Sequence, residues 1–281
     1  MNALDIINFG AKELKQKRIA SSRLDSELLL SKILNKKREE ILINLNQEIC
    51  QKYFSEYKKL IIRRSLNEPV AYILEEKEFW SKIFFVNTDT LIPRPETELM
   101  IEQLIKIYKG KKISILDVGT GSGCISISLL SELKNSKAIG IDISKKALKI
   151  AKKNLEKHGL QDKIKFLNKS LDSKFYQKFD LVVSNPPYIK SHEIKNLSQD
   201  IKKYEPLIAL DGGNDGLDLI KKVIYKTKYI LKDNGMLALE IGNEQFEKVS
   251  EILIKKNFKI EHTIKDYKDN IRCIVSTYIG N

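Results

Sequence analysis

From Ile113 to its C-terminal end, the chain alternates between short apolar segments and longer amphipathic ones, and this alternation restricts its fold more than any other feature. Short runs rich in β-branched residues predict strands, and apolar residues at every third or fourth position predict helices. The pattern predicts a strand at 113–118, a helix at 124–133, a strand at 138–142, a helix at 145–158, strands at 164–167 and 179–184, a helix at 217–231, a strand at 236–241, a helix at 245–255, and strands at 258–265 and 272–278. Such alternating units predict an α/β fold with a doubly wound, mostly parallel sheet. No helix separates the last two strands, so one of them is expected to run antiparallel.

Residues 1–70 follow a helical pattern instead. Apolar side chains recur at helix-like spacings with charged residues between them. The segment contains little glycine and no proline before Pro69, so it lacks the turn residues of a sheet. We predict a small helical domain over residues 1–70, whose second helix starts at Ser22 or Asp25 and ends at Asn35.

The segment that follows, 71–95, is expected to link the helical domain to the alternating region. Val70–Ile73 and Phe79–Val86 are rich in β-forming residues, and a charged segment joins them, which predicts a β-hairpin. Pro95 suits the first turn of a helix. That helix opens the largest expected domain, residues 96–281.

Composition limits the compartment and the partners. The three cysteines form no Cys-x-x-Cys pair, which indicates a reducing cytoplasm and no structural zinc, and the three histidines are too far apart to suggest a metal site. No apolar run reaches transmembrane length, and no signal-peptide pattern begins the chain. The net charge of +13 comes mostly from lysines spread along the sequence. Solvated helix faces and compositional bias explain this charge as well as nucleic-acid binding does.

A glycine-rich turn follows the first strand of the alternating region, in the stretch Asp117-Val-Gly119-Thr120-Gly121-Ser122-Gly123. Glycines let the backbone approach a ligand closely at the end of a strand. The spacing is neither that of dinucleotide enzymes nor that of a phosphate loop. Asp142 ends the next strand, where it can accept both hydroxyls of a ribose, and Asp117 can face a cationic or amino group. These features predict S-adenosylmethionine as the ligand.

Asn185-Pro186-Pro187-Tyr188 follows the apolar strand expected at 179–184. The prolines have no N–H and cannot extend a sheet, so the carbonyls remain available to a ligand. The Asn185 side chain and the Pro186 carbonyl can hydrogen-bond a planar amino or amide group while Tyr188 stacks on it. The sequence therefore predicts a site for a planar nitrogen, although Asn-Pro pairs also occur in simple turns.

Both motifs are expected in one crevice, because ligands of doubly wound sheets bind outside the carboxyl ends of the strands. A conjugated nitrogen is a poor nucleophile. Two hydrogen bonds to its N–H groups would turn its lone pair toward the methyl group of the donor, and positioning alone can then accelerate transfer greatly. A strong general base is not required in advance, because the proton can leave after the nitrogen becomes cationic.

Several stretches together resemble the bacterial release-factor glutamine methyltransferase family (PrmC/HemK), and the likeness covers nearly the whole chain. The matching stretches are 68–73, 77–80, 91–98, 116–123, 184–189, 204–210, 213–217 and 239–242, with Gln245. This resemblance implies a seven-stranded class I (Rossmann-like) methyltransferase domain. It also implies S-adenosylmethionine as the methyl donor and S-adenosylhomocysteine as the product.

The resemblance further implies methylation of the side-chain amide nitrogen (N5) of the glutamine in the Gly-Gly-Gln motif of peptide chain release factors 1 and 2. The enzyme would be a cytoplasmic monomer that needs no metal, membrane or direct nucleic-acid contact. Glutamine binding and catalysis would fall to Asn185, Pro186, Pro187 and Tyr188. Cofactor binding would fall to Asp117, Gly119, Thr120, Gly121, Ser122, Gly123, Asp142, Ser170, Leu171 and Asn185.

Two positions depart from the family pattern. Glu75 stands where a glycine is frequent, so the hairpin turn is expected to differ. Ser170 and Leu171 stand where the family usually has an acid and an aromatic ring against adenine, which would replace ring stacking by aliphatic contact. Asp172 is an alternative source of the acid.

Three other functions are compatible with parts of the sequence. The ribosomal protein L3 glutamine methyltransferase has the same Asn-Pro-Pro-Tyr motif, but Arg94–Glu98 resembles the release-factor enzyme better. Methyltransferases that act on exocyclic amines in DNA or rRNA also use the motif, and the positive charge favours them slightly. Against them, the chain has no target-recognition region beyond its helical domain. A non-catalytic S-adenosylmethionine-binding module is least expected, because donor loop and amide site are both intact.

Overall fold

The computed structural model describes residues 1–280, which form two compact units. The smaller unit comprises Met1–Glu76 together with Ser198–Tyr204. The larger unit comprises Lys77–Leu197 and the residues from Glu205 onward. A short segment from far along the sequence thus completes the N-terminal unit, and most of the expected linker belongs to the larger one.

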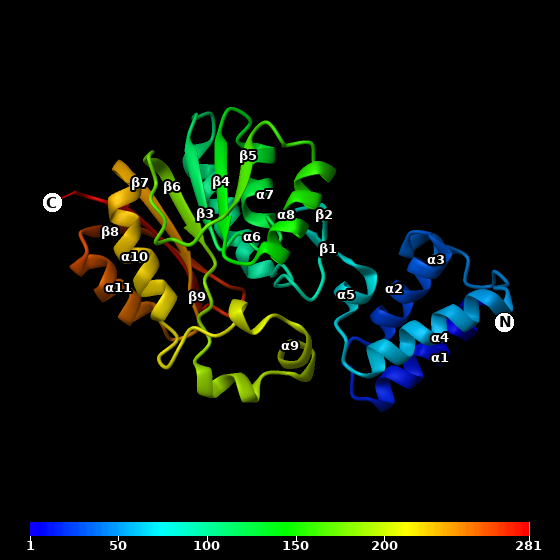
Figure 1. Ribbon diagram of the computed structural model, residues 1–281. Coiled ribbons are helices and arrows are strands. Elements are labelled where there is room, and N and C mark those ends of the chain that lie inside the picture. Colours follow the sequence, from blue (N-terminus) through cyan, green and yellow to red (C-terminus); the bar gives the residue numbers. More distant parts are fainter. Residues whose placement is uncertain (281) are drawn as a thin grey trace. The chain divides into compact units, whose positions relative to one another are not determined.

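The smaller unit is a bundle of helices (Figure 1). Its helices are α1 (Ala3–Gln16), α2 (Ser22–Leu34), α3 (Arg38–Ile43), α4 (Gln51–Ser65), α5 (Val70–Leu74) and α9 (Gln199–Tyr204). Ile6, Ile7 and Tyr57 are fully buried in its apolar core. Asn2 caps the first helix through its side chain, and Asn35 ends α2 in the left-handed conformation, which confirms the predicted end of this helix.

One local prediction is wrong. The segment that begins at Val70 forms helix α5 and not the first strand of a hairpin. Pro69 precedes this helix directly, where its missing N–H costs no hydrogen bond, and Ala71, Tyr72 and Ile73 are buried. Burial in the helical unit therefore overrides the β propensity of these residues.

The hairpin lies after this helix. Strand β1 (Glu76–Phe79) pairs with β2 (Lys82–Phe85). Trp80 and Ser81 connect them, and their φ angles of 52° and 51° are those of a two-residue type I′ turn. The second expected strand is therefore divided into the end of β1, a turn and β2.

The larger unit contains a seven-stranded sheet with the order β5-β4-β3-β6-β7-β9-β8. Its strands are β3 (Ser114–Val118), β4 (Lys137–Asp142), β5 (Ile164–Asn168), β6 (Phe179–Ser184), β7 (Leu231–Glu240), β8 (Phe258–Lys265) and β9 (Ile271–Tyr278). β9 runs antiparallel to β7 and β8, and the other pairs are parallel. The doubly wound α/β class with one reversed strand is therefore confirmed. Strand order reverses between β3 and β6, where such sheets bind ligands.

Helices cover both faces of this sheet (Figure 1). One face carries α6 (Pro95–Tyr108), α7 (Cys124–Glu132) and α8 (Lys145–Lys157), and the other carries α10 (Asp218–Ile230) and α11 (Phe246–Lys255). Successive side chains of a strand point to opposite faces, so Ile115 belongs to the first apolar core and Leu116 to the second. Burial on both faces explains why the strands read as continuous apolar runs.

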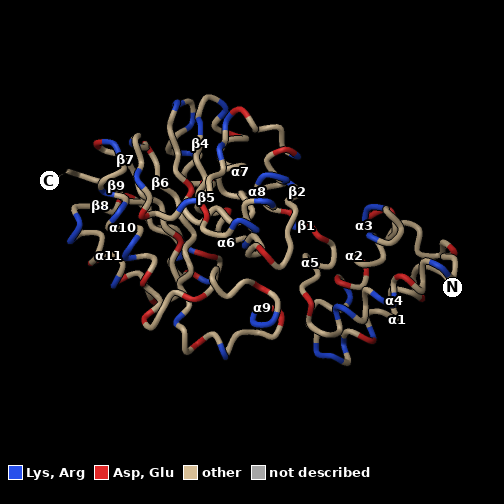
Figure 2. Tube along the Cα trace, in the orientation of Figure 1, with Lys and Arg blue, Asp and Glu red and all other residues tan. Residues whose placement is uncertain are grey.

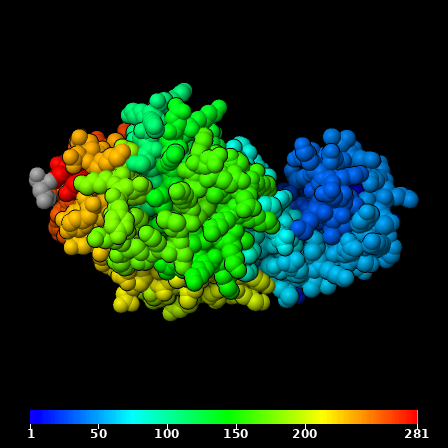
Figure 3. Space-filling view, turned by 45° about the horizontal axis from the view of Figure 1, so that its top comes forward, coloured from blue at the N-terminus to red at the C-terminus, as the bar shows by residue number. Residues whose placement is uncertain are grey.

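The connection from β6 to α10 is long, and the sequence did not predict its internal structure. It contains two short 3-10 helices, η1 (Ser191–Asn196) and η2 (Leu207–Ala209), besides α9. Its base is closed, because Ile189 N donates to Leu210 O at 3.0 Å and Gly212 N donates to Ile189 O at 2.8 Å. Residues just after 205 (yellow in Figure 3) lie at the surface along the lower edge of the larger unit in this view.

Basic residues are spread over both units and alternate with acidic ones along the chain (Figure 2). Within residues 1–280, no helix is long and apolar enough to cross a membrane. In the same described part of the chain, no group of three or more His, Cys, Asp or Glu side chains is arranged to hold a metal ion.

Candidate active site

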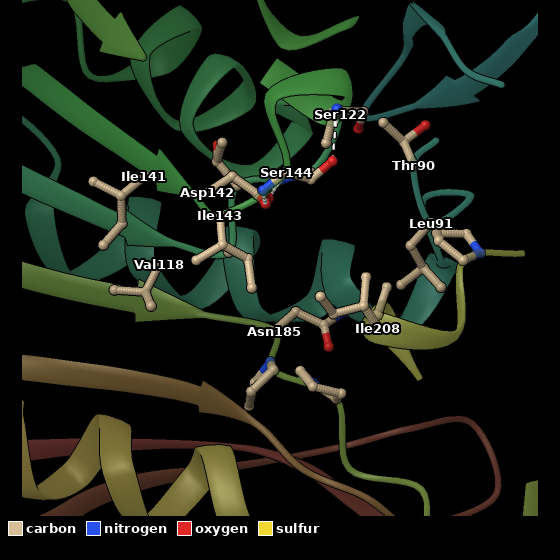
Figure 4. A pocket seen from close by; sticks show the side chains of 18 of the residues that line it. Thr90, Leu91, Val118, Ser122, Ile141, Asp142, Ile143, Ser144, Asn185 and Ile208 are labelled. Atoms are coloured by element: carbon tan, nitrogen blue, oxygen red, sulfur yellow. Dashed lines mark hydrogen bonds between the residues drawn. The ribbon is translucent and has the colours of Figure 1, made fainter. Parts of the chain in front are cut away.

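A pocket in the larger unit lies at the carboxyl ends of β3, β4 and β6 (Figure 4). Its walls come from the glycine turn, the residues after β4 and β5, the loop after β6, and the linker before α6. It brings together most of the predicted site residues, namely Gly119, Thr120, Gly121, Ser122, Asp142, Ser170, Leu171, Asn185, Pro186 and Pro187. Asp117, Gly123 and Tyr188 lie outside its lining.

Backbone hydrogen bonds fix the glycine turn against the neighbouring strand. Gly119 N and Thr120 N both donate to Ile141 O, at 2.9 and 3.0 Å. Gly119 has a φ of 72°, and no atom lies within 4 Å of the position where a Cβ would stand, so the backbone faces open space there. At Gly123, with a φ of 80°, a Cβ would lie 2.8 Å from the Phe166 ring. The first glycine leaves room for a ligand, and the second allows close packing.

Asp142 orders the turn and also faces the pocket (Figure 4). Its Oδ2 accepts a hydrogen bond from Gly121 N at 2.9 Å, and its Oδ1 accepts one from Ser144 N at 2.8 Å. Each carboxylate oxygen can accept more than one hydrogen bond, so both remain able to bind ligand hydroxyls. The side chain therefore joins the glycine turn, the start of α8 and the pocket.

Asp117 lies beneath the turn and is fully buried. Its Oδ2 accepts a hydrogen bond from Thr120 Oγ1 at 2.6 Å, whereas its Oδ1 has no hydrogen-bond partner among residues 1–280. Loss of hydration raises the pKa of this carboxyl to about 6, although the neighbouring Thr120 and Ser126 oppose that rise. A buried oxygen without a partner is rare in proteins, so this carboxylate is a candidate for contact with a water molecule or a ligand group.

One wall of the pocket is aliphatic. Ile141, Ile143 and Leu171 contribute to it, and no aromatic ring is among the lining residues of the described chain. Leu171 is buried, whereas the Ile143 side chain is largely exposed. Together these two side chains provide apolar surface for a flat apolar ligand. Asp172 does not reach the lining, because its carboxylate pairs with Lys222 and with Lys226 instead.

The Asn185 side chain reaches the pocket from the end of β6 (Figure 4). Its Nδ2 donates to Thr97 Oγ1 at 3.2 Å, and Thr97 Oγ1 in turn donates to Glu240 Oε2 at 2.5 Å. Glu240 ends β7 and is fully buried. The predicted amide-binding asparagine is therefore held from behind by α6 and β7.

Tyr188 points away from the pocket. Its hydroxyl lies 3.4 Å from Glu240 Oε1 and accepts a hydrogen bond from Arg272 Nη2 at 3.0 Å. Burial raises the pKa of this phenol above its ordinary value, and the nearby Glu240 raises it further. The ring packs against the apolar core under α10 and α11 and does not present a stacking face to the pocket lining.

Gln245 fixes the backbone behind the Asn-Pro-Pro-Tyr segment. Its Nε2 donates to Tyr188 O at 3.0 Å and to Gly216 O at 3.2 Å, and its Oε1 accepts from Gly242 N at 2.8 Å. A buried carboxamide with all these bonds satisfied is rigid. The loop after β6 is therefore anchored to β7 and to the start of α10.

An ion pair holds the part of the pocket wall that the linker before α6 provides. Glu205 Oε1 pairs with Arg94 Nη2 at 2.5 Å, and Glu205 Oε2 accepts from Ile92 N at 3.2 Å. Glu205 is buried, whereas Arg94 is partly exposed and lines the pocket. This contact joins the linker before α6 to the segment that carries η2.

Sequence reasoning did not single out Thr97, Glu205, Glu240 or Gln245 as site residues, although it quoted the stretches that contain them. One signal was present: Glu240 ends an apolar run, and an ionisable residue at the carboxyl end of a buried parallel strand points to the ligand edge of a sheet. The contribution of Thr97 had no such signal, because only the fold brings α6 next to β6.

Two regions of the chain match models of known protein families. Residues 5–74 match the model of the PrmC N-terminal domain, and residues 95–204 match that of the methyltransferase small domain. The hMettl16 catalytic domain has a similar structure, with a TM-score of 0.57 and 15% sequence identity over 85% of this chain and 87% of that one. At this identity the likeness shows a shared fold, the class I (Rossmann-like) methyltransferase fold.

Two relatives in sequence are informative. A bifunctional methyltransferase of Rickettsia typhi is 38% identical over 96% of this chain, which spans 56% of that protein's length. The release factor glutamine methyltransferase of Clostridium botulinum is 39% identical over 96% of this chain and 97% of its own length. The chain thus spans little more than half of the Rickettsia relative but nearly all of the Clostridium one. Since both of its regions match over these lengths, the chain belongs to the release factor glutamine methyltransferase family.

Proposed function

We propose that this protein transfers a methyl group from S-adenosylmethionine to the side-chain amide nitrogen of the glutamine in the Gly-Gly-Gln motif of peptide chain release factors. The observation that carries this proposal is the single pocket that contains both the glycine turn with Asp142 and the amide-binding Asn185. Family membership supports the choice of a protein glutamine over a nucleic-acid amine.

The pocket residues fit the proposed donor. Asp142 would accept the ribose hydroxyls, Ile143 and Leu171 would enclose the adenine, and Ser170 would lie at its edge. The open backbone at Gly119 leaves room for the amino-acid portion, and the unpartnered Oδ1 of Asp117 lies beneath the same turn. When bound, S-adenosylmethionine supplies an electrophilic methyl group.

The amide nitrogen of glutamine is weakly nucleophilic, so the residues act by positioning it. Asn185 Oδ1 and the Pro186 carbonyl accept its N–H hydrogen bonds and hold its lone pair toward the donor. Pro187 shapes the same wall, and Tyr188 supports the loop from behind through Glu240 and Arg272. The proton leaves after the nitrogen becomes cationic, so no strong base is needed in the pocket.

The substrate class is tested directly by competition. The protein is incubated with isotopically labelled S-adenosylmethionine and a mixture of release factors, ribosomal protein L3, DNA and rRNA, and the labelled species are identified by mass spectrometry. Label on the Gly-Gly-Gln glutamine of a release factor is expected. Label on L3 or on a base would replace the proposal by one of the alternative functions, and absence of label would leave a non-catalytic binding module.

Asn185→Ala should lower the rate of methyl transfer about 100- to 1,000-fold, the usual effect of removing one well-placed hydrogen-bonding group from an active site. Binding of S-adenosylmethionine should remain measurable by titration calorimetry, because the glycine turn and Asp142 are intact. Asn214→Ala, at an exposed position outside the pocket lining, is the matched control and should retain full activity. Unchanged turnover in Asn185→Ala would exclude the proposed amide site.

Release factors 1 and 2 are the proposed partners, and the proposed location is the cytoplasm, where three free cysteines are stable. We further propose that the protein acts as a monomer. Sedimentation at the concentrations of the activity assay tests this, since a dimer would be heavier by a factor of two.

A further inference from the structure

A partly buried chain of hydrogen bonds runs from β9 to the side chain of Asn185. Arg272 Nη2 bonds to the Tyr188 hydroxyl at 3.0 Å, and this hydroxyl lies 3.4 Å from Glu240 Oε1. Thr97 Oγ1 donates to the other carboxylate oxygen of Glu240, Oε2, at 2.5 Å. Asn185 Nδ2 in turn donates to Thr97 Oγ1 at 3.2 Å. An ionised Glu and an Arg have fixed hydrogen-bonding character, so the direction of every bond in this chain can be worked out while Glu240 is ionised.

An ionised carboxylate only accepts hydrogen bonds, and a guanidinium only donates them. Glu240 therefore takes the single hydroxyl proton of Thr97, which leaves Thr97 Oγ1 able only to accept from its other neighbour. That neighbour is the Asn185 carboxamide, which must then turn its NH2 group toward Thr97. The carbonyl oxygen of Asn185, Oδ1, is left for the pocket.

We propose that Glu240 and Thr97 are positioning residues that fix the amide orientation of Asn185, so that it presents a hydrogen-bond acceptor to the substrate nitrogen. This inference rests on the proposed function and extends it to residues that touch neither substrate nor donor. A carboxamide flipped by 180° would present its NH2 group instead, which repels the N–H groups of a glutamine amide. The orientation of one side chain thus decides whether the pocket can hold its substrate.

The orientation of the Asn185 carboxamide is expected to depend on pH. Burial raises the pKa of Glu240 to about 7, and the Thr97 hydrogen bond and Arg272 only partly oppose this. The other groups that face it are Glu96, also from α6, the Tyr188 hydroxyl, Cys273 on β9 and Cys124 on α7. A protonated Glu240 can donate to Thr97, which frees the Thr97 proton for Asn185 Oδ1 and allows the flip. Activity is therefore lost as the pH falls through about 7.

The first test compares two substitutions at one position. Thr97→Val keeps the shape but has no hydroxyl, and kcat with a release factor should fall about 10- to 100-fold, the usual cost of removing a group that orients an active-site residue. Thr97→Ser keeps the hydroxyl and should stay within a few-fold of wild type. The affinity for S-adenosylmethionine should be the same in both. Wild-type kcat in Thr97→Val, or equal losses in both variants, would overturn the proposal.

The second test is the pH profile of kcat between pH 5.5 and 9. Wild-type activity should fall on the acidic side, whereas Glu240→Gln, which cannot titrate, should give a flat profile over the same range. Donor affinity is measured at each pH, because Asp117 also titrates in this range. An acidic limb that persists unchanged in Glu240→Gln would show that another group controls the orientation.

A third measurement does not depend on activity. The Asn185 side-chain amide signal in a ¹⁵N spectrum is identified by its absence from Asn185→Ala, and its proton exchange with water is measured. Exchange should be slow in wild type and clearly faster in Thr97→Val. If wild type methylates no release factor but this difference is found, the proposed function fails and the orientation stands. If methylation occurs and exchange is equal, the orientation is wrong.

Discussion

At the scale of single residues, Asp142 has two roles, and its position at the end of β4 makes both possible. It holds the glycine turn and the start of α8 through two backbone N–H groups, and it faces the pocket. Charge-assisted hydrogen bonds of this kind are about twice as strong as neutral ones. Loss of the carboxylate should therefore affect both ligand contacts and the shape of the turn that surrounds the ligand.

Asp142→Ala is expected to weaken binding of S-adenosylmethionine at least about 10-fold, because it removes hydrogen bonds to a charged group worth roughly 1.5–3 kcal/mol each. Titration calorimetry measures the dissociation constant. Asp233→Ala removes an exposed acid that lies outside the pocket lining, so this variant should bind the donor as wild type does. An unaltered dissociation constant in Asp142→Ala would refute its assignment to the ribose.

At the scale of helices and strands, sequence predicted most of the larger unit because the central strands β3 and β6 are buried on both faces and the helices on one. β6 and β8 begin and end where expected, and α8 stops before Gly159, which takes the left-handed conformation. The failures have a different cause. α5 and the 3-10 helices after β6 are short, and their conformation depends on contacts with distant segments that local patterns do not contain.

The same limit applies to the site. Sequence located the pocket segments because strand ends and glycine turns have local signals. It did not predict that Tyr188 points at Glu240, since that contact depends on how β7 pairs with β6. The Thr97 contact with Asn185 likewise requires α6 to lie against the sheet at a particular height.

One element offers a stability test. Glu75 ends α5 with a φ of 63°, the left-handed conformation that costs a residue with a side chain roughly 1–2 kcal/mol. Glu75→Gly should therefore raise the free energy of unfolding by roughly 0.5–1 kcal/mol, since the greater freedom of glycine in the unfolded chain offsets part of the gain. Urea unfolding measures the change.

Lys17→Gly is the control for this prediction. Lys17 also ends a helix, α1, but with a φ of −87°, so glycine relieves no strain there and should lower stability. Equal effects of both substitutions would mean that the backbone conformation at Glu75 carries no cost.

At the scale of the whole molecule, the two units divide the chemistry. All residues that line the pocket belong to the larger unit, whereas the smaller unit contains an apolar core and surface helices. The smaller unit also includes Ser198–Tyr204, where the Tyr204 hydroxyl donates to Leu66 O at 3.2 Å. Since this segment belongs to the loop that follows Asn185–Tyr188, we propose that the helical unit recognises the release factor and that its covalent continuity with the loop matters for that task.

This division predicts how truncation changes substrate choice. A chain without residues 1–74 should bind S-adenosylmethionine with unchanged affinity, because no pocket residue is removed. It should methylate a short Gly-Gly-Gln peptide at a rate close to that of the intact chain, and a full-length release factor at least about 10-fold more slowly, which corresponds to the loss of roughly 1.4 kcal/mol of binding. The truncation also removes the hydrogen bond between the Tyr204 hydroxyl and Leu66 O. Tyr204→Phe in the intact chain removes this hydrogen bond alone, and it should leave the rates with peptide and with full-length factor nearly unchanged. Equal losses on peptide and full-length factor would show that the helical unit supports the fold of the pocket, and equal retention of both rates would show that it does not bind the substrate.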